Sequence, residues 1–278
     1  MSTSLQLNVN ECPIFISSAD SYSDLWPLFF QIFRREWPSY KGIIYLNTEV
    51  KGFSYPGLNI VCTKTGRQRH FGETFFAGID SVPNDHFLLM CIDYFFEGRA
   101  DIAMLQRIYT AFCTLKPDSV RLITHPFRNR EQIDGVPECY RIKPPCASCS
   151  WFSLQMAFWS KAAIHKFIKP WEDPWQSEHF GSRRALRMNP NIWNVFEMPI
   201  KYDAAGVLHG GRWYEVAVRK IDFSGLDVDF TKRGYYNDRH SWLYRKLKIQ
   251  FLKRYLGSWA NFCCHIRSMW SVLNDVNC

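Results

Sequence analysis

The sequence has no long run of apolar residues. None of its 278 residues lies in a stretch that approaches the roughly 18–20 consecutive apolar residues of a membrane-spanning helix. Residues 1–10 contain neither the basic nor the apolar part of a secretory signal. We therefore expect the protein to remain cytoplasmic, where it is made.

The cysteines lack the spacing of a metal site or of a disulfide scaffold. There are ten, but only Cys146 and Cys149 form a C-x-x-C pair, and neither a second pair nor Cys139 completes a tetrahedral zinc site. Disulfide scaffolds are usually small secreted domains that begin with a signal, and this chain has neither property. We interpret the pair as part of a reduced structural loop.

The composition is that of a folded protein whose charge is unevenly distributed. Hydrophobic residues make up 47% of the chain and aromatic residues 17%, which is enough for one large α/β domain or two small ones. The net charge is +8, but residues 231–278 hold nine Lys and Arg against two Asp, whereas residues 1–230 are nearly neutral. A basic tail on a neutral body indicates an anionic partner such as a membrane surface, a nucleic acid or a lipid phosphate.

The first half of the chain alternates short apolar runs with amphipathic stretches. The apolar runs predict strands, and Asp24 and Asp101 are suited to cap the helices that follow them. Strands that alternate with helices predict an α/β fold with a mostly parallel central sheet flanked by helices. We expect strands at 13–18, 42–47, 58–62, 85–92 and 120–123, and helices from Asp24, over 72–80 and from Asp101.

The second half of the chain is less regular. A glycine-rich loop, 206–211, lies between its last two expected strands, and no linker divides the chain before the tail. We therefore expect a single domain over residues 1–230, with halves of about 1–125 and 126–230, and a basic amphipathic helical region over 231–278. The patterns predict strands at 151–159, 193–198 and 213–218, and helices at 160–167 and 178–187.

Polar residues follow several of the expected strands. In open α/β sheets, ligands bind beyond the carboxyl ends of the strands, which points to Ser17–Asp20, Asn47–Glu49 and Asp93–Glu97. Asp93 ends the most apolar strand, and a carboxylate in that place can hold a divalent cation against a diphosphate. An aspartate that only caps a turn remains the alternative.

Glu178 is a second candidate, in a segment rich in tryptophan. Apolar walls raise the pKa of a carboxyl group towards neutrality, which suits a general base that removes a proton from a sugar hydroxyl, and the ring of Trp175 could stack on a pyranose. The alternative is an ordinary surface residue at the start of a helix, paired with Arg183 or Arg184.

The glycine-rich loop and the tail carry weaker signals. Glycines let the backbone approach a diphosphate, and His209 could bind a metal, although such loops are often plain β-turns. In the tail, Leu243, Leu247 and Phe251 recur at helical spacing among basic residues. Such a helix could lie on an anionic membrane surface, or it could pack on the body with a solvated basic face.

Several segments between about residues 12 and 215 form an ordered set of motifs. They are residues 16–26 and 43–49, the strand end 89–95, the pattern Leu154, Gln155 and Trp159, the pattern Pro174, Trp175, Glu178, Gly181, Ser182 and Arg184, and the late pair Gly211 and Trp213. Together, and in this order, these motifs resemble those of a family of bacterial glycosyltransferases for capsular polysaccharide and lipopolysaccharide.

The resemblance implies a GT-A-like fold and a transferase that uses a nucleotide-diphosphate sugar. Glu178 would be the catalytic base, Asp93 and His209 would bind Mn²⁺ or Mg²⁺, and Trp175 and Arg184 would contact the acceptor. The residues that would bind the nucleotide sugar are Ser17, Ser18, Asp20, Asn47, Thr48, Glu49, Asp93 and Tyr94. Many relatives have an acidic residue at the position of Ile92, so the dependence on metal stays open.

The expected function is therefore the inverting transfer of a sugar to a glycan or lipid-linked acceptor of the capsule, O-antigen or lipopolysaccharide. Residues 1–125 would form the nucleotide-sugar half and 126–230 the acceptor half, and the basic tail would hold the enzyme on the inner face of the inner membrane. A nucleic-acid-binding protein without catalytic activity is one alternative, although the sequence has no nucleic-acid motif and we expect no nucleic acid as a partner. An inactive relative that serves as an assembly partner is the other.

Overall fold

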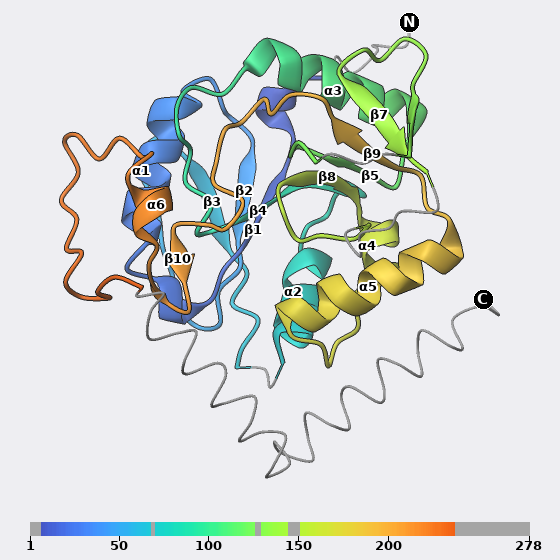
Figure 1. Cartoon of the computed structure of the whole chain (residues 1–278). Helices are drawn as coiled ribbons and strands as arrows, with labels where there is room; N and C mark the ends of the chain where they lie inside the picture. Colours follow the sequence, from blue (N-terminus) through green and yellow to red (C-terminus); the bar gives the residue numbers. More distant parts are fainter. Residues whose placement is uncertain (1–6, 68–69, 126–128, 144–150, 237–278) are drawn as a thin grey trace, which may run out of the picture.

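One large sheet forms the centre of the protein. A computed structural model describes residues 7–67, 70–125, 129–143 and 151–236, and nine strands of this part pair in the order β3-β2-β1-β4-β8-β5-β9-β7-β6 (Figure 1). The strands are β1 Ile14–Ser17, β2 Ile43–Leu46, β3 Asn59–Cys62, β4 His86–Cys91, β5 Ser119–Arg121, β6 Arg130–Gln132, β7 Cys139–Ile142, β8 Ala157–Ser160 and β9 Ile192–Val195.

Most strands of the sheet point the same way. β1 to β4 are parallel to one another, and β8 is antiparallel to both β4 and β5, so β5 and its parallel neighbour β9 share the direction of β4. β7 and β6 complete the far side as antiparallel strands that we did not foresee from the sequence. The expected α/β fold with a mostly parallel central sheet is confirmed, while the tail beyond Tyr236 lies outside the described residues.

Helices cover both faces of the sheet. α1 (Trp26–Glu36), α3 (Ile102–Leu115) and the short α6 (Glu215–Val218) lie on one face (Figure 1). α2 (Phe71–Asp80), α4 (Lys161–Phe167) and α5 (Pro174–Met188) lie on the other. A small antiparallel hairpin, β10 (Leu208–His209) and β11 (Arg212–Trp213), stands apart from the large sheet.

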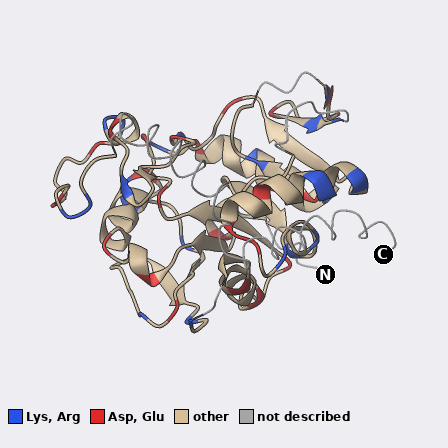
Figure 2. Cartoon of the chain, turned by 60° about the horizontal axis from the view of Figure 1, so that its bottom comes forward, with Lys and Arg blue, Asp and Glu red and all other residues tan. Residues whose placement is uncertain are grey.

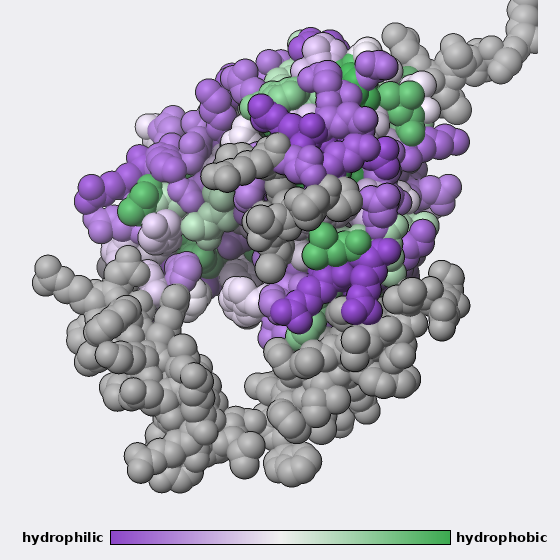
Figure 3. All heavy atoms as spheres, turned by 45° about the vertical axis from the view of Figure 1, so that its right-hand side comes forward, coloured by the Kyte–Doolittle hydropathy of each residue, from purple (hydrophilic) through white to green (hydrophobic). Residues whose placement is uncertain are grey.

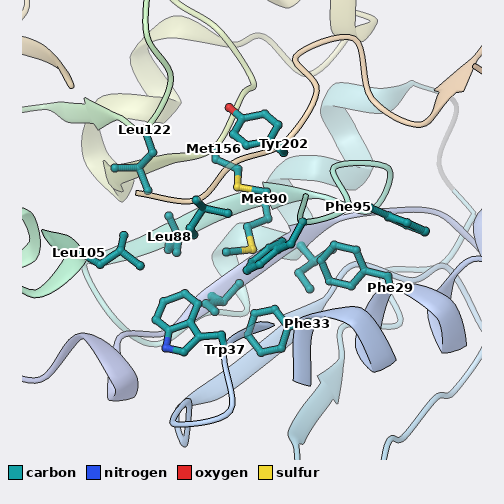
Figure 4. Packing of buried hydrophobic residues seen from close by; sticks show 14 of the residues in the cluster. Phe29, Phe33, Trp37, Leu88, Met90, Phe95, Leu105, Leu122, Met156 and Tyr202 are labelled. Atoms are coloured by element: carbon teal, nitrogen blue, oxygen red, sulfur yellow. The ribbon is translucent and has the colours of Figure 1, made fainter. Parts of the chain in front are cut away.

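The side chains of β4 divide between these two layers. Leu88 and Met90 point into the cluster under α1 and α3, part of which Figure 4 shows, whereas Phe87 and Leu89 point into the cluster under α2, α4 and α5. All four are fully buried. A strand that is buried on both faces has a continuous apolar sequence, which is why β4 was the plainest strand to predict.

Polar side chains cover the outside of the described body. Figure 2 shows acidic and basic residues interspersed over it, and the face in Figure 3 is mostly hydrophilic with small, separate apolar patches. Within the described ranges no helix has the length and apolar character needed to cross a membrane.

Several local expectations from the sequence are wrong. The strand expected at 151–159 is confined to β8, Ala157–Ser160. Asp24 does not cap α1, since Leu25 occupies the N-cap position and the carboxylate of Asp24 pairs with Arg233 instead. α5 begins at Pro174 behind the capping residue Asp173, so Glu178 lies inside the helix. Residues 213–218 do not form one strand, because β11 ends at its second residue and α6 follows with its own buried face.

A buried ion pair joins the three helices of the second face. Arg184 of α5 donates to the two carboxylate oxygens of Glu172 at 2.9 and 2.6 Å, and neither side chain has any exposed surface. The same guanidinium donates to the carbonyl of Phe167, the last residue of α4. The carbonyl of Glu172 accepts the N–H of Gly72 in α2, so α2, α4 and α5 meet at this pair.

We predict that Arg184→Leu lowers the free energy of unfolding by about 3–5 kcal/mol, because it leaves the carboxylate of Glu172 buried without its partner. Arg183→Leu is the matched control, since Arg183 is the preceding residue of the same helix and is exposed, and it should change stability by less than about 0.5 kcal/mol. Urea unfolding of both variants measures the difference. Equal stabilities would contradict the structural role of the pair.

Candidate functional site

The candidate site lies at the carboxyl ends of the central strands. Because β1, β2 and β4 are adjacent and parallel, Ser17, Asn47 and Asp93 emerge at the same edge of the sheet. β8 runs the opposite way, so the residues that precede it also reach this edge. The segments that the sequence marked as ligand-binding are therefore neighbours in space.

Asp93 follows β4 by two residues and lies under a turn of the second half. The N–H of Val207 donates to the carbonyl of Asp93 at 2.8 Å. Gly206 has a φ of +73°, and a Cβ atom on it would lie 2.6 Å from Asp93 Oδ2. The carboxylate is half-buried, and burial raises its pKa to about 6 although its own backbone N–H lowers it. Nowhere in the described ranges does a cationic side chain form an ion pair with Asp93.

Glu178 is held by one of its two carboxylate oxygens. The hydroxyl of Ser153 and the N–H of Leu154 donate to Glu178 Oε1 at 3.1 and 2.9 Å. In the part of the chain that the structure describes, no other hydrogen bond reaches this side chain, so Oε2 is left for a ligand. These two donors fix the orientation of the carboxylate.

The charges of Asp93 and Glu178 both influence the side chains of Cys91 and Tyr94. Burial raises the pKa of Cys91 and of Tyr94, and both carboxylates raise each of these values further. A short chain of contacts also joins Cys91, the last residue of β4, to Glu178, because Cys91 Sγ donates to the carbonyl of Leu154, whose N–H donates to Glu178. The structure thus brings the two carboxylates predicted from the sequence to one region of the edge.

Tyr202 and Gln155 complete this region, and sequence reasoning assigned neither to it as a contact residue. The rings of Tyr94 and Tyr202 are 4.9 Å apart, and the hydroxyl of Tyr202 donates to Gln155 Oε1 at 3.5 Å. Gln155 Nε2 donates to the carbonyl of Ala204 at 3.3 Å. Gln155 was part of the sequence pattern Leu154, Gln155 and Trp159, whereas residues 201–205 carried no sequence signal.

Several expected donor-binding residues direct their polar atoms into the protein. Asn47 Oδ1 accepts a hydrogen bond from Thr63, and Thr48 Oγ1 accepts the N–H of Lys64; both Asn47 and Thr48 are buried. The hydroxyl of Ser18 accepts the indole N–H of Trp26 at 2.8 Å. We therefore correct the expectation that Asn47 and Thr48 contact the donor, because their side chains shape the loop beyond β2.

Asp20 joins the two loops that follow β1 and β2. Its carboxylate accepts the N–H groups of Glu49, Val50 and Lys51 at 2.9, 3.0 and 3.1 Å. Burial raises the pKa of Asp20, but these hydrogen bonds and the charge of Lys51 outweigh it and lower the value overall. The carboxylate is thus already occupied, whereas the side chains of Ser17 and Glu49 remain partly exposed at the edge.

The two expected acceptor residues differ in their surroundings. Trp175, in the first turn of α5, is 78% exposed and is free to contact a ligand. The expectation for Arg184 is wrong, because its guanidinium is buried against Glu172 and cannot reach an acceptor. Arg184 therefore supports α5, the helix that carries Glu178.

His209 lies in β10, three residues beyond the glycine that covers Asp93. Its ring centroid is 4.4 Å from that of Tyr236 and 6.0 Å from that of Tyr214. Over the described ranges, no three His, Cys, Asp or Glu side chains gather in a way that could hold a metal ion. The pair Cys146 and Cys149 lies outside the described residues.

A pocket of about 580 Å³ lies at the other end of the sheet. It borders the first residues of β2 and β3 and is therefore separate from the carboxyl edge. Its lining residues are Arg34, Pro38, Tyr40, Lys41, Gly42, Gly57, Leu58 and Asn59.

Comparisons with known proteins return distant structural likenesses. No family model and no curated protein matches the chain, so the resemblance to polysaccharide glycosyltransferases stays a proposal. A UDP-glucose pyrophosphorylase complexed with UDP-glucose is 9% identical, with a TM-score of 0.41 over 69% of this chain and 92% of that one. The UTP-bound UGPase from Acinetobacter baumannii is 10% identical, with a TM-score of 0.40 over 69% of this chain and 87% of that one. The bifunctional IspDF from Campylobacter jejuni is 10% identical, with a TM-score of 0.36 over 76% of this chain and 54% of that one. At such TM-scores these likenesses carry no argument about activity, which must rest on the geometry of the site.

We predict that Asp93→Asn stabilises the protein near neutral pH. The pKa of Asp93 is about 6 in the fold against 3.8 as its ordinary value, so the folded state loses stability as the pH rises between these values. The variant should be more stable than the wild type at about pH 7.5 and nearly equal to it at about pH 4, as measured by thermal unfolding. A difference that does not depend on pH would contradict the burial of an ionised Asp93.

We also predict that Gly206→Ala is more damaging than Gly225→Ala. Both glycines have φ near +74°, so alanine is strained at both, but only at Gly206 would the new methyl group meet Asp93. The excess loss of stability at Gly206, measured by urea unfolding, should shrink when Asp93 is replaced by alanine. If the two alanine variants are equally stable, Gly206 does not lie against Asp93.

Proposed function

We propose that the protein is a glycosyltransferase that moves a sugar from a nucleotide-diphosphate donor to a hydroxyl group of a cell-surface glycan acceptor, in the capsule, O-antigen or lipopolysaccharide. The observation that carries this proposal is that both carboxylates belong to the end of β4, at the carboxyl edge of the sheet. Asp93 follows this strand by two residues, and Glu178 accepts the N–H of Leu154, whose carbonyl accepts Cys91 Sγ. That edge is where ligands bind in open α/β sheets. One carboxylate would lie beside the departing diphosphate and the other beside the incoming hydroxyl.

Glu178 is the residue that we propose as the general base. Its Oε1 is anchored by Ser153 and Leu154, which leaves Oε2 to accept the proton of the acceptor hydroxyl. The acceptor oxygen forms a bond to the anomeric carbon as the bond from that carbon to the diphosphate oxygen breaks, and the nucleoside diphosphate leaves with the electron pair. Such a direct displacement inverts the anomeric carbon.

Asp93 is the residue that we propose as the ligand of a divalent cation, with His209 as a second candidate. A half-buried carboxylate whose pKa is raised to about 6 by burial, and which forms no ion pair in the described part of the chain, would be stabilised by a cation. A bound Mn²⁺ or Mg²⁺ supplies charge neutralisation for the leaving diphosphate. Ser17, Ser18, Glu49 and Tyr94 are the proposed contacts of the donor along the same edge.

Trp175 and the tail are the proposed contacts on the acceptor side. The indole of Trp175 is exposed in the helix that carries Glu178, so it can stack on an acceptor sugar. The basic residues Arg245, Lys246, Lys248, Lys253 and Arg254 of the tail favour an anionic membrane surface, where each contributes about 1 kcal/mol. We therefore propose a peripheral, cytoplasmic location on the inner face of the inner membrane, with a lipid-linked or lipopolysaccharide acceptor.

We predict that nucleotide-diphosphate sugars raise the melting temperature of the protein, and that Mn²⁺ enhances this shift through Asp93. Ligands that bind only the folded state stabilise it by mass action. A panel of donors should give one or a few clear shifts, and Asp93→Asn should remove the effect of Mn²⁺. If no donor shifts the melting temperature while RNA binds with strong salt dependence, the protein is a nucleic-acid-binding protein instead.

We predict that Glu178→Gln reduces kcat for sugar transfer by about 10²–10⁴-fold, because the amide cannot take a proton, while donor affinity changes by less than about threefold. Glu197→Gln is the matched control, since Glu197 is exposed and lies away from the anchoring contacts of Glu178. Initial rates with the donor identified above measure the effect. Transfer at the wild-type rate by Glu178→Gln would exclude this residue as the base.

A further inference from the structure

Residues 222–236, which follow α6, return to the hairpin formed by β10 and β11. The N–H of Trp213 in β11 donates to the carbonyl of Gly234 at 2.9 Å, and the N–H of Tyr236 donates to the carbonyl of Trp213 at 2.8 Å. Phe230 packs against Trp213 with ring centroids 5.3 Å apart. This segment therefore lies alongside the hairpin that contains His209, and it includes the first residues of the basic region.

Arg233 fastens this segment to the loop after β1. Its Nε and Nη2 donate to Asp24 Oδ2 and Oδ1 at 2.7 and 2.5 Å, and Nη2 also donates to the carbonyl of Ser21 at 3.0 Å. Its Nη1 donates to the carbonyl of Gly211 at 3.1 Å. One side chain thus joins three parts of the chain, namely the loop after β1, the turn between β10 and β11, and its own segment.

The ion pair between Arg233 and Asp24 is sheltered and has a fixed geometry. The exposed fractions of the two side chains are only 14% and 20%. A bidentate pair between a guanidinium and a carboxylate is directional, and shelter from water strengthens it. A guanidinium has five N–H donors, and these contacts use four of them, so Arg233 has little capacity left to bind a phosphate itself.

Tyr22 connects this pair to the candidate site. The guanidinium carbon of Arg233 lies 5.4 Å from the centroid of the Tyr22 ring, in a cation–π contact. Burial raises the pKa of Tyr22, the charge of Asp93 raises it further, and the charge of Arg233 lowers it. Tyr22 is therefore within electrostatic range of both Arg233 and Asp93.

We propose that Arg233 is a positioning residue, which holds the loop 18–24 and the turn at Gly211 in the arrangement that binds the donor. The proposal rests on the function given above, since it assumes that the donor binds beside β1 and β4. Arg233 acts through Asp24, Ser21 and Tyr22 and does not touch the donor. The segment that leads into the basic tail then leaves the body from the donor side.

Substitution of Arg233 tests this role by separating donor binding from turnover. Arg233→Ala should raise the KM for the donor by about tenfold and change kcat by less than about threefold, because the base Glu178 lies on a different element. Arg233→Lys keeps the charge but loses the bidentate contact with Asp24, so its KM for the donor should lie between those of Arg233→Ala and the wild type. Arg219→Ala is the control, because it breaks the exposed Arg219–Glu215 pair of α6 and should leave KM unchanged.

Hydrogen exchange provides a second measurement that does not depend on activity. In Arg233→Ala, and also in Arg233→Lys if the alanine variant does not fold, the amides of residues 18–24 and 209–214 should exchange faster than in the wild type, with no such change in Arg219→Ala. Unchanged exchange, or a KM equal to that of Arg219→Ala, would overturn the proposal. If the wild type binds no donor, the proposed function fails, and the exchange data still decide whether Arg233 orders the loop.

Discussion

The burial of β4 on all sides is the constraint on which the candidate site depends. Its side chains are covered on both faces, and it pairs with β1 on one edge and with β8 on the other. A polar residue cannot be accommodated along such a strand without a partner, so the first carboxylate appears where the strand ends, at Asp93. The antiparallel β8 brings Ser153 and Leu154 to the same place, and these residues fix Glu178.

The two carboxylates are held in opposite ways. Glu178 is oriented by two donors on one oxygen, whereas Asp93 is half-buried without an ion pair in the described part of the chain and lies under a glycine with positive φ. A carboxylate that is destabilised in this way is suited to a cationic ligand, which relieves the cost of burying its charge. The buried pair of Glu172 and Arg184 holds α5, the helix that carries Glu178, against the end of α4.

The sequence predicted local elements well and long-range contacts poorly. The parallel strands β1 to β4 were found because their apolar runs are continuous, and Asp101 was recognised as the cap of α3 because capping is a local interaction. The polar edge strand β6, with the sequence Arg-Glu-Gln, has no hydrophobic pattern and was missed. Arg184 and Asp24 were assigned to the wrong partners. Arg184 contacts Phe167, and Asp24 contacts Arg233, only because the tertiary fold brings these distant residues together.

The most direct test of the account is a crystal structure of Glu178→Gln with a nucleotide-diphosphate sugar and Mn²⁺. The account predicts that the diphosphate lies beside Asp93 at the carboxyl edge, and that the anomeric carbon faces the side chain at position 178. A nucleotide bound at the other end of the sheet, in the pocket that Arg34 and Lys41 line, would contradict it.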